Sequence, residues 1–268
     1  MADPGPALLA VAHGTRDPAG PAVIGDLLDR VRALRPGLRV AGAYGELARP
    51  SLEEAASVLA GGPVVVVPLL LARGYHALID IPDRAARLLP GAVTSRPLGP
   101  DPLLADALAD RLADRLADGP ADRLADGPAD GPRDTLGDPL GAWTRISPRR
   151  PDAVVLGAAG SADPAGAADV RAAAQLLARR LRRPVTCGFV AAGGPALDEA
   201  VARLRRRGAG RVVVAPYLLA PGRFLDRARD CGADAVAAPI GAHGAAARLV
   251  LRRYDEARSR RGEPVPVR

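Results

Sequence analysis

The chain has 268 residues, of which 48% are apolar and 25% are charged, close to the averages of a soluble globular protein. This length allows one large domain or two small ones. No apolar run approaches the roughly 20 residues of a membrane-spanning helix, and the first residues lack the pattern of a secretory signal. The two cysteines, Cys187 and Cys231, cannot form a disulfide framework and lack metal-ligand spacing. We therefore expect a soluble, cytoplasmic protein without a resident cofactor.

The formal net charge of +7 is unevenly distributed. Residues 1–100 carry a net +1, residues 101–140 a net −6 and residues 141–268 a net +12. All the strongly basic residues are arginines, which suit carboxylate or phosphate recognition, although we interpret most of them as solvated surface. Aromatic residues make up only 3% of the chain, so the stacking platforms of a single-strand nucleic-acid binder are nearly absent. We expect neither a nucleic-acid nor a membrane partner.

Short β-branched runs alternate with helical stretches along the first hundred residues. Strands are expected at 6–12, 38–44, 63–71 and 92–95, and helices at 18–35, 51–60 and 79–89. This alternation is typical of a parallel sheet with helices on both faces. The four valines at 64–67 show no polar alternation, as expected of a strand that is buried on both faces.

From residue 109 the pattern changes to a tetrapeptide repeat that ends at Pro132. It reads Ala-Asp-Arg-Leu twice, Ala-Asp-Gly-Pro once, Ala-Asp-Arg-Leu once more and then Ala-Asp-Gly-Pro twice. The Arg-Leu units can extend a helix, because Asp and Arg pair on a helix surface, whereas Gly-Pro ends one. We interpret residues 109–150 as an acidic tether, helical at its start and then disordered. A metal-gathering role for its aspartates is the less favoured alternative.

The same order of elements starts again after the tether. Strands are expected at 153–156, 184–189, 211–219 and 233–237, and helices at 164–181, 195–206, 223–230 and 245–257. Sequence repeats as well, since VVVVPLLLARG at 64–74 returns as VVVAPYLLAPG at 212–222. The chain is therefore predicted to be an α/β protein with two tandem copies of one parallel-sheet unit. The expected domains are 1–108 and 151–260, with a tail at 261–268.

Three polar residues of the first copy have no polar counterpart in the second. His13, Glu46 and His76 correspond to Ala159, Ala191 and Phe224. Each of the three follows a different strand, so all are expected at the carboxyl edge of the sheet, where open parallel sheets bind ligands. Two imidazoles and a carboxylate there would suit Fe²⁺, Co²⁺, Ni²⁺ or Zn²⁺. Taken singly, they also fit a turn cap, a surface carboxylate and a half-buried histidine.

The segments AHGTRDP, ELARPSLEEA and PLLLARGYH, in this order and spacing, resemble the sirohydrochlorin chelatases, a family of class II chelatases. The similarity covers about residues 6–105 and 152–258, and long members of the family resemble fused pairs of the short homodimeric form. The family inserts a divalent metal into sirohydrochlorin on the way to sirohaem or cobalamin. The resemblance implies that His13 and His76 bind the metal, that Glu46 acts as ligand or proton acceptor, and that the active site lies in the cleft between the copies.

Sirohydrochlorin is a large planar ring with eight carboxylates, so its pocket needs apolar walls and a cationic rim. Arg16, Arg73 and Arg223 are expected in strand-end loops, where guanidinium groups can bind carboxylates in a bidentate manner. Arg16 has the alternative of a salt bridge to Asp17 or Asp26. The ring-packing surface is expected from residues 69–71, Tyr75, Tyr217 and Phe224. The third histidine, His243, is expected to cap the last helix or to lie between the domains.

The favoured function is therefore a lyase-type chelatase that inserts Fe²⁺, or alternatively Co²⁺, into sirohydrochlorin and needs no cofactor beyond this metal. A metal or tetrapyrrole carrier without turnover is the alternative, because the same side chains would serve delivery. A phosphohistidine nucleophile at His13 is less favoured, because no arginine precedes that histidine. We expect a monomer with an internal pseudo-dimer and one metal site.

Overall fold

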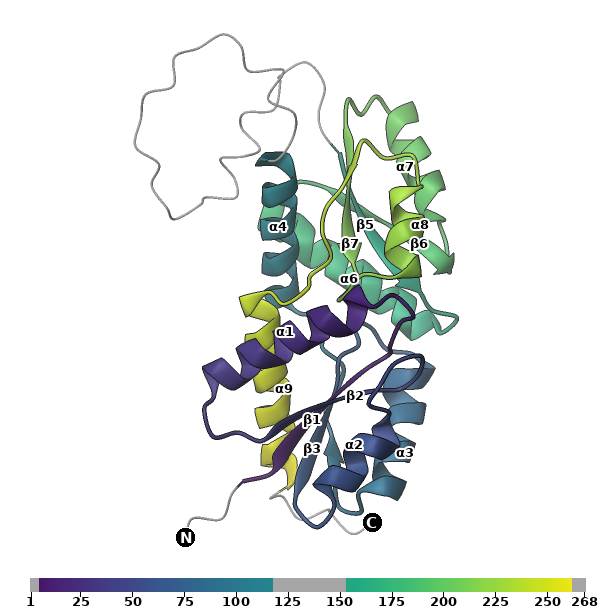
Figure 1. Ribbon diagram of the computed structural model, residues 1–268. Helices are drawn as coiled ribbons and strands as arrows, with labels where there is room; N and C mark the ends of the chain where they lie inside the picture. The colour runs from purple at the N-terminus through teal and green to yellow at the C-terminus, as the bar shows by residue number, and fades with distance from the viewer. Residues whose placement is uncertain (1–4, 118–152, 262–268) are drawn as a thin grey trace, which may run out of the picture.

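The computed structural model describes residues 5–117 and 153–261, and these residues form two four-stranded parallel sheets (Figure 1). The strand order is β2-β1-β3-β4 in the first half and β6-β5-β7-β8 in the second. The prediction of two tandem α/β units is thereby confirmed. Within the same ranges, no helix has the length and apolar character that crossing a membrane requires.

The elements follow the predicted order. The first half contains β1 (Ala7–Ala12), α1 (Ala19–Leu34), β2 (Val40–Tyr44), α2 (Leu52–Leu59), β3 (Val64–Pro68), η1 (His76–Asp80), α3 (Ile81–Leu88), β4 (Val93–Thr94) and α4 (Pro102–Ala117). The second contains β5 (Ala153–Gly160), α6 (Pro164–Leu181), β6 (Val185–Ala192), α7 (Leu197–Arg206), β7 (Val212–Tyr217), α8 (Arg223–Arg229), β8 (Ala235–Val236) and α9 (Gly244–Arg261). Strand β3 ends at Pro68, so the chain beyond it is free to line the pocket described below.

The Asp-Pro pair of each half begins its first helix. The Oδ1 atom of Asp17 accepts a hydrogen bond from the N–H of Ala19 at 2.9 Å. In the second half Asp163 makes the same bond to Ala165 at 2.8 Å. Such side-chain caps satisfy N–H groups that have no partner within the helix. The repeated motif therefore sets where α1 and α6 begin, next to the strand-end loops.

Each sheet separates two cores. Leu8 of β1 belongs to one core, together with Ile24 of α1 and Leu249 of α9. The next residue, Leu9, faces the opposite core with Leu52 of α2. Covering both faces is the expected state of an all-parallel sheet. The core under α1 and α9 continues into the second half, so the two units share one interior.

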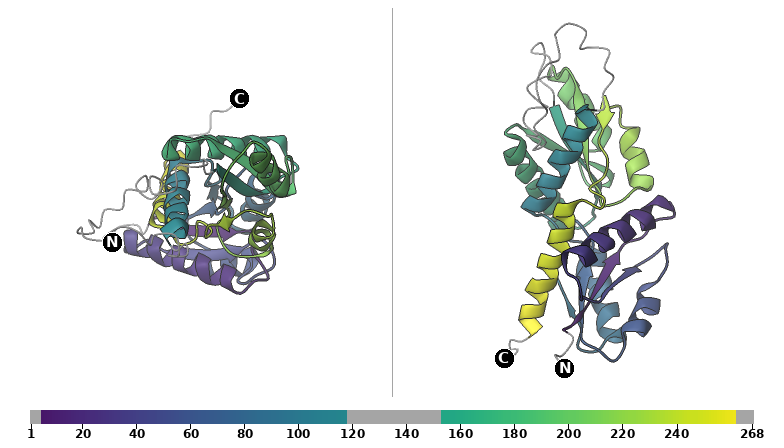
Figure 2. Two further views of the ribbon diagram at one scale, coloured as in Figure 1. Left: turned by 90° about the horizontal axis from the view of Figure 1, so that it is seen from above. Right: turned by 60° about the vertical axis from the view of Figure 1, so that its left-hand side comes forward.

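The last helix of each half packs on the sheet of the other half. Helix α4 follows β4 but lies against α6 and β7, whereas α9 follows β8 but lies against α1 and β3. Figure 1 shows α4 beside the second sheet and α9 beside the first, and Figure 2 shows α9 alongside α1. The boundary expected at residues 108–109 consequently falls inside α4. Residues 118–150 of the expected tether, and the tail from residue 262, lie outside the described residues.

An ionic cluster holds the two exchanged helices where they meet. Asp101 caps α4 by accepting from the N–H of Leu103 at 3.0 Å. The same carboxylate binds Arg252 and, at 2.9 Å, the fully buried Arg253 of α9. Arg253 also donates to the carbonyl of Leu98 at 2.6 Å. Since a buried charge is tolerated only when it is paired and hydrogen-bonded, this cluster fixes how α9 docks on the first half.

His243 caps α9 and also touches α4. Its Nδ1 atom accepts from the N–H of Ala245 at 3.1 Å, and its Nε2 atom lies 3.2 Å from a carboxylate oxygen of Asp110. The neutral imidazole therefore carries its proton on Nε2. Both roles expected for this histidine, helix cap and contact between the halves, are present.

Candidate functional site

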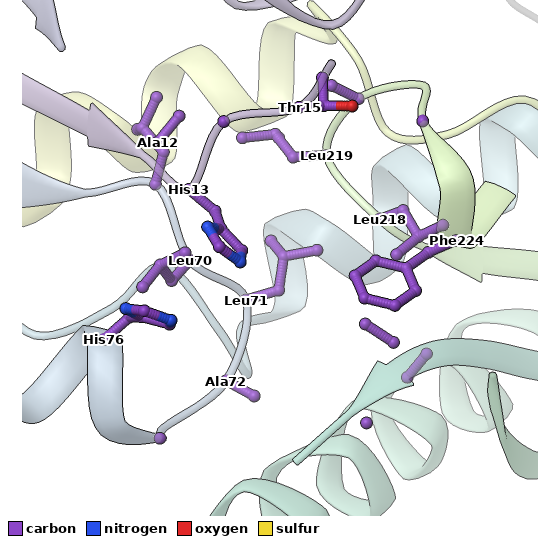
Figure 3. A pocket seen from close by; sticks show the side chains of 18 of the residues that line it. Ala12, His13, Thr15, Leu70, Leu71, Ala72, His76, Leu218, Leu219 and Phe224 are labelled. Carbon is purple, nitrogen blue, oxygen red and sulfur yellow. The ribbon is translucent and has the colours of Figure 1, made fainter. Parts of the chain in front are cut away.

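A pocket of about 740 Å³ lies between the two halves. Its walls come from the loops after β1, β2 and β3 in the first half and after β5 and β7 in the second. The lining is mainly apolar and includes Leu69. Figure 3 labels Leu71, Leu218 and Leu219 among its other apolar residues. Its volume falls in the usual range for small-molecule sites. The pocket lies at the carboxyl edge of both sheets, which is where the sequence analysis predicts a ligand site.

His13 and His76 come together on one side of this pocket. His13 follows β1, whereas His76 begins η1, and the centroids of the two rings lie 4.8 Å apart with a tilt of 37°. Figure 3 shows both imidazoles on the side opposite Phe224. Two residues separated by more than sixty positions thus form the pair that the sequence predicts.

The imidazole of His13 has an unsatisfied nitrogen. Its Nδ1 atom is buried and has no hydrogen-bond partner within the described part of the chain. Buried polar atoms are nearly always paired, so each exception needs a reason. The absence of a protein partner is explained if this imidazole nitrogen binds a ligand such as a metal ion.

Glu46 contacts His13 through the backbone and does not complete a metal-binding cluster with the two histidines. Its backbone N–H donates to the carbonyl of His13 at 2.9 Å, and the residue lines the same pocket. Gly14 makes this approach possible, because a Cβ atom there would lie 1.8 Å from the carbonyl oxygen of Glu46, and its φ is +99°. Across residues 5–117 and 153–261, no three His, Cys, Asp or Glu side chains gather as metal ligands.

The second half repeats the backbone of this site without its polar groups. Gly160 has a φ of +101°, and a Cβ atom there would lie 1.9 Å from the carbonyl oxygen of Ala192. The pairing of β5 with β6 shifts register between Ala158 and Gly160, so the spatial counterpart of Glu46 is Ala192, one residue beyond the expected Ala191. Both are alanines. Phe224 stands where the first half has a histidine, and its ring faces the pocket (Figure 3).

Arg73 connects the two halves. Its Nε and Nη2 atoms donate to the carboxylate of Asp169 on α6 at 2.9 and 2.7 Å, and its backbone N–H donates to the same group at 2.8 Å. The Asp169 side chain is 7% exposed. These donors are therefore engaged with the protein itself, which does not fit the substrate-binding role expected for Arg73. A contact between residues almost a hundred positions apart leaves no local sequence signal.

The other arginines at the pocket have no carboxylate partner among the described residues. Arg16 and Arg223 are exposed, line the pocket and form no ion pair with any described residue. The salt bridge of Arg16 to Asp17 or Asp26, considered from the sequence, is accordingly not formed. Arg227 shares these properties and was not foreseen, although its position one turn after Arg223 on α8 was a usable signal. The pocket thus has cations from both halves.

Apolar side chains flank the mouth of the pocket. Tyr75 is 64% exposed and its ring meets that of His76 edge-on at 5.5 Å. Leu47, which the sequence did not single out, is 53% exposed and has a φ of 60°, unusual for a residue other than glycine. Deeper in, the hydroxyl of Tyr217 donates to the carbonyl of Leu71 at 2.9 Å, and burial raises its pKa. The site is prepared for a ligand with a large apolar surface.

Together the fold and the site define a duplicated α/β protein with an apolar pocket between its halves, beside a pair of histidines. A family model described as CbiX matches residues 7–115 and 153–257. The chain therefore belongs to the CbiX family, and the resemblance to the sirohydrochlorin chelatases is confirmed.

Individual relatives agree with this family. A sirohydrochlorin cobaltochelatase of Methanosarcina acetivorans is 30% identical over 114 residues, which cover 37% of this chain and 88% of the relative. The structure of SirB from Bacillus subtilis with Fe³⁺ has a TM-score of 0.71 at 23% identity and covers 95% of this chain and 96% of that one. The structure of CbiX described as the terminal enzyme of siroheme biosynthesis in denitrifying bacteria has a TM-score of 0.64 at 22% identity, with coverage of 94% and 99%. These two structures share the two-unit fold.

Proposed function

We propose that this protein is a sirohydrochlorin chelatase that inserts a divalent metal, Fe²⁺ in preference to Co²⁺, into its tetrapyrrole substrate. The observation that carries the proposal is the pair of imidazoles, His13 and His76, with ring centroids 4.8 Å apart in an apolar pocket between the halves. The family and the cobaltochelatase relative support the same activity.

The pocket suits both the apolar ring and the charged periphery of such a substrate. A macrocycle with eight carboxylates needs apolar contacts for the ring and cations for its periphery. Leucines and Tyr75 supply the first, and Arg16, Arg223 and Arg227 supply the second. Because the cations are exposed and unpaired within the described ranges, binding a carboxylate does not require breaking an existing ion pair.

The metal enters as a dication and two pyrrole N–H protons leave, so the charge of the ring core is conserved. Neutral imidazoles bind a borderline divalent metal firmly enough to strip water from it, yet release it to the ring nitrogens. His13 and His76 perform this step in our proposal. Glu46, whose loop touches His13 through the backbone, accepts a proton or serves as a further ligand.

The choice between Fe²⁺ and Co²⁺ depends on more than affinity. Imidazole binds both ions, and the order of divalent affinities does not reproduce physiological selectivity. Preference is therefore measured by competition under anaerobic conditions, with both metals present at equal concentration. A faster rate with Co²⁺ would reverse the proposed order of metals without affecting the chelatase activity.

Turnover separates a chelatase from the alternative, a carrier of metal or tetrapyrrole. Metal-free sirohydrochlorin is mixed with Fe²⁺ and a substoichiometric amount of protein, and insertion is followed by absorbance. Conversion of excess substrate above the uncatalysed rate, lost in His13→Ala and His76→Ala but kept in His243→Asn, supports the enzyme. Binding of one equivalent without turnover would favour the carrier. The cytoplasmic location and the monomeric state stay predictions, the latter to be tested by analytical ultracentrifugation.

A further inference from the structure

His76 has a carboxylate partner that the proposed chemistry does not use. The Nδ1 atom of His76 lies 3.2 Å from Oδ2 of Asp80, which is only 18% exposed. An ionised carboxylate accepts hydrogen bonds and cannot donate them. A neutral His76 that makes this bond therefore carries its proton on Nδ1 and keeps the lone pair of Nε2 free.

The local helix geometry explains how the two side chains meet. The N–H of Ile81 bonds to the carbonyl of His76, five residues earlier, so η1 is a π-helical turn. The next residue, Pro82, has no N–H group. The regular α-helical hydrogen bond to the carbonyl of Leu78 therefore cannot form here. The wide turn keeps His76 and Asp80, four residues apart, on the same side of the helix. π-turns of this kind occur frequently at functional sites.

Asp80 is held in place by Arg84, one turn further along. Nη1 of Arg84 lies 3.5 Å from Oδ2 of Asp80 and donates to the carbonyl of Gly45 at 3.0 Å. Nη2 of the same arginine donates to Glu53 of α2 at 2.8 Å. Gly45 directly precedes Glu46 in the loop that contacts His13. One polar network thus joins the support of His76 to the loop beside the second histidine.

We propose that Asp80, fixed by Arg84, is a positioning residue that holds His76 in the Nδ1–H tautomer and presents Nε2 to the incoming metal. Carboxylate partners of this kind orient metal-binding histidines in proteins generally. A direct ligand role for Asp80 is disfavoured by the guanidinium beside it. The part that concerns metal rests on the proposed function, whereas the tautomer of His76 does not.

The tautomer is measured without any enzymatic assay. Protein labelled with ¹⁵N-histidine is examined by long-range ¹H–¹⁵N NMR at about pH 8.5, where ordinary imidazole side chains are neutral. The His76 signal is identified by its loss in His76→Ala. We expect Nδ1–H in the wild type, a shift towards Nε2–H in Asp80→Ala, and retention of Nδ1–H in Asp80→Asn, whose amide oxygen still accepts. The matched control is Asp83→Ala, an exposed acid on α3, which directly follows η1.

Metal binding is measured separately with Co²⁺ alone. Loss of such a supporting carboxylate typically weakens metal binding about 10- to 100-fold, so we expect this loss in Asp80→Ala, a smaller one in Asp80→Asn and none in Asp83→Ala. An unchanged tautomer in both Asp80 variants, or an Nε2–H tautomer in the wild type, would overturn the proposal even if the protein is a chelatase. If the wild type and its variants show the expected tautomers and Co²⁺ affinities but the wild type has no turnover, only the proposed function is refuted.

Discussion

Arg73, in the loop after β3, and Asp169, on α6, form an ion pair across the two halves, in which three N–H groups of the arginine donate to one carboxylate. Removing the guanidinium would leave the nearly buried Asp169 without its partner, which is more costly than the loss of an exposed pair. We predict that Arg73→Ala lowers the midpoint of thermal unfolding. Asp169→Asn, which keeps a hydrogen-bond acceptor, should lower it less.

The same variants distinguish a structural arginine from a substrate-binding one. If Arg73 holds the halves together, Arg73→Ala measured well below its melting temperature should keep the KM for the tetrapyrrole close to that of the wild type. A KM raised as strongly as in Arg223→Ala, with unchanged melting, would restore the role that the sequence suggested.

Arg223 is exposed at the pocket and unpaired with any described residue, so its contribution should be an attraction through solvent. Exposed ion pairs are weak and screened by salt over roughly 10 Å at 0.1 M. We predict that Arg223→Ala raises KM about two- to five-fold at low salt, and that this difference shrinks as ionic strength rises. Arg229→Ala, on the same helix and paired with Asp226, is the matched control. A salt-independent effect of Arg223→Ala would contradict simple steering.

His243 should make the stability of the protein sensitive to acid. Burial lowers its pKa; Asp110 opposes this shift, and Arg111 and Arg248 add to it. The folded protein therefore takes up this proton less readily than the unfolded chain, so the stabilisation is complete above about pH 6.5, the ordinary histidine value, and declines as the pH falls below it. Protonation of Nδ1 also removes the cap on α9, since that atom accepts from Ala245.

The measurement compares urea unfolding of the wild type and of His243→Asn at pH 7.5 and 5.5. Asparagine also caps helices but does not titrate. The wild type should lose more stability between these two pH values than the variant does. Equal losses would show that other groups dominate the acid response.

The exchange of helices α4 and α9 predicts that the two halves unfold together. Leu108 of α4 is fully buried in the core shared by both halves, although α4 belongs to the first half in sequence. Leu108→Ala should therefore lower the free energy of unfolding by about 2–5 kcal/mol, as for other buried leucines, within a single calorimetric transition. Leu34→Ala, at a 49% exposed position, should change it by less than about 0.5 kcal/mol. Two separate transitions would show that the halves are independent.

The internal repeat explains why so much of the fold could be predicted. Two copies of one pattern gave two independent indications of each strand, and the histidines stood out because Ala159 and Phe224 replace them. The helix exchange could not be foreseen, because an apolar helix face does not specify which of two similar sheets it covers. The bond between His76 and Asp80 was not predicted, because the helix expected from the sequence begins at residue 79 and leaves out His76. The contact of Arg73 with Asp169 depends on tertiary structure alone.

The asymmetry between the halves leads to a prediction about metal stoichiometry. The first half offers two imidazoles to the pocket, whereas Ala159, Ala192 and Phe224 offer no ligand atoms from the equivalent positions. Titration with Co²⁺, followed by its absorption spectrum, should therefore give one strong site per chain. His13→Ala should abolish it, because a single histidine does not hold a divalent metal firmly.

The repeat also supplies a gain-of-site control. In Ala159→His/Phe224→His, the second half carries imidazoles at the positions that correspond to His13 and His76, on a backbone with the same glycine approach at Gly160. This variant should bind a second equivalent of Co²⁺ more weakly than the first, because the second half has no counterpart of the Asp80 carboxylate. Ala228 corresponds to Asp80, and Arg227 corresponds to Ile79. Two strong sites in the wild type, one of which survives His13→Ala, would show that the second half has a metal centre of its own.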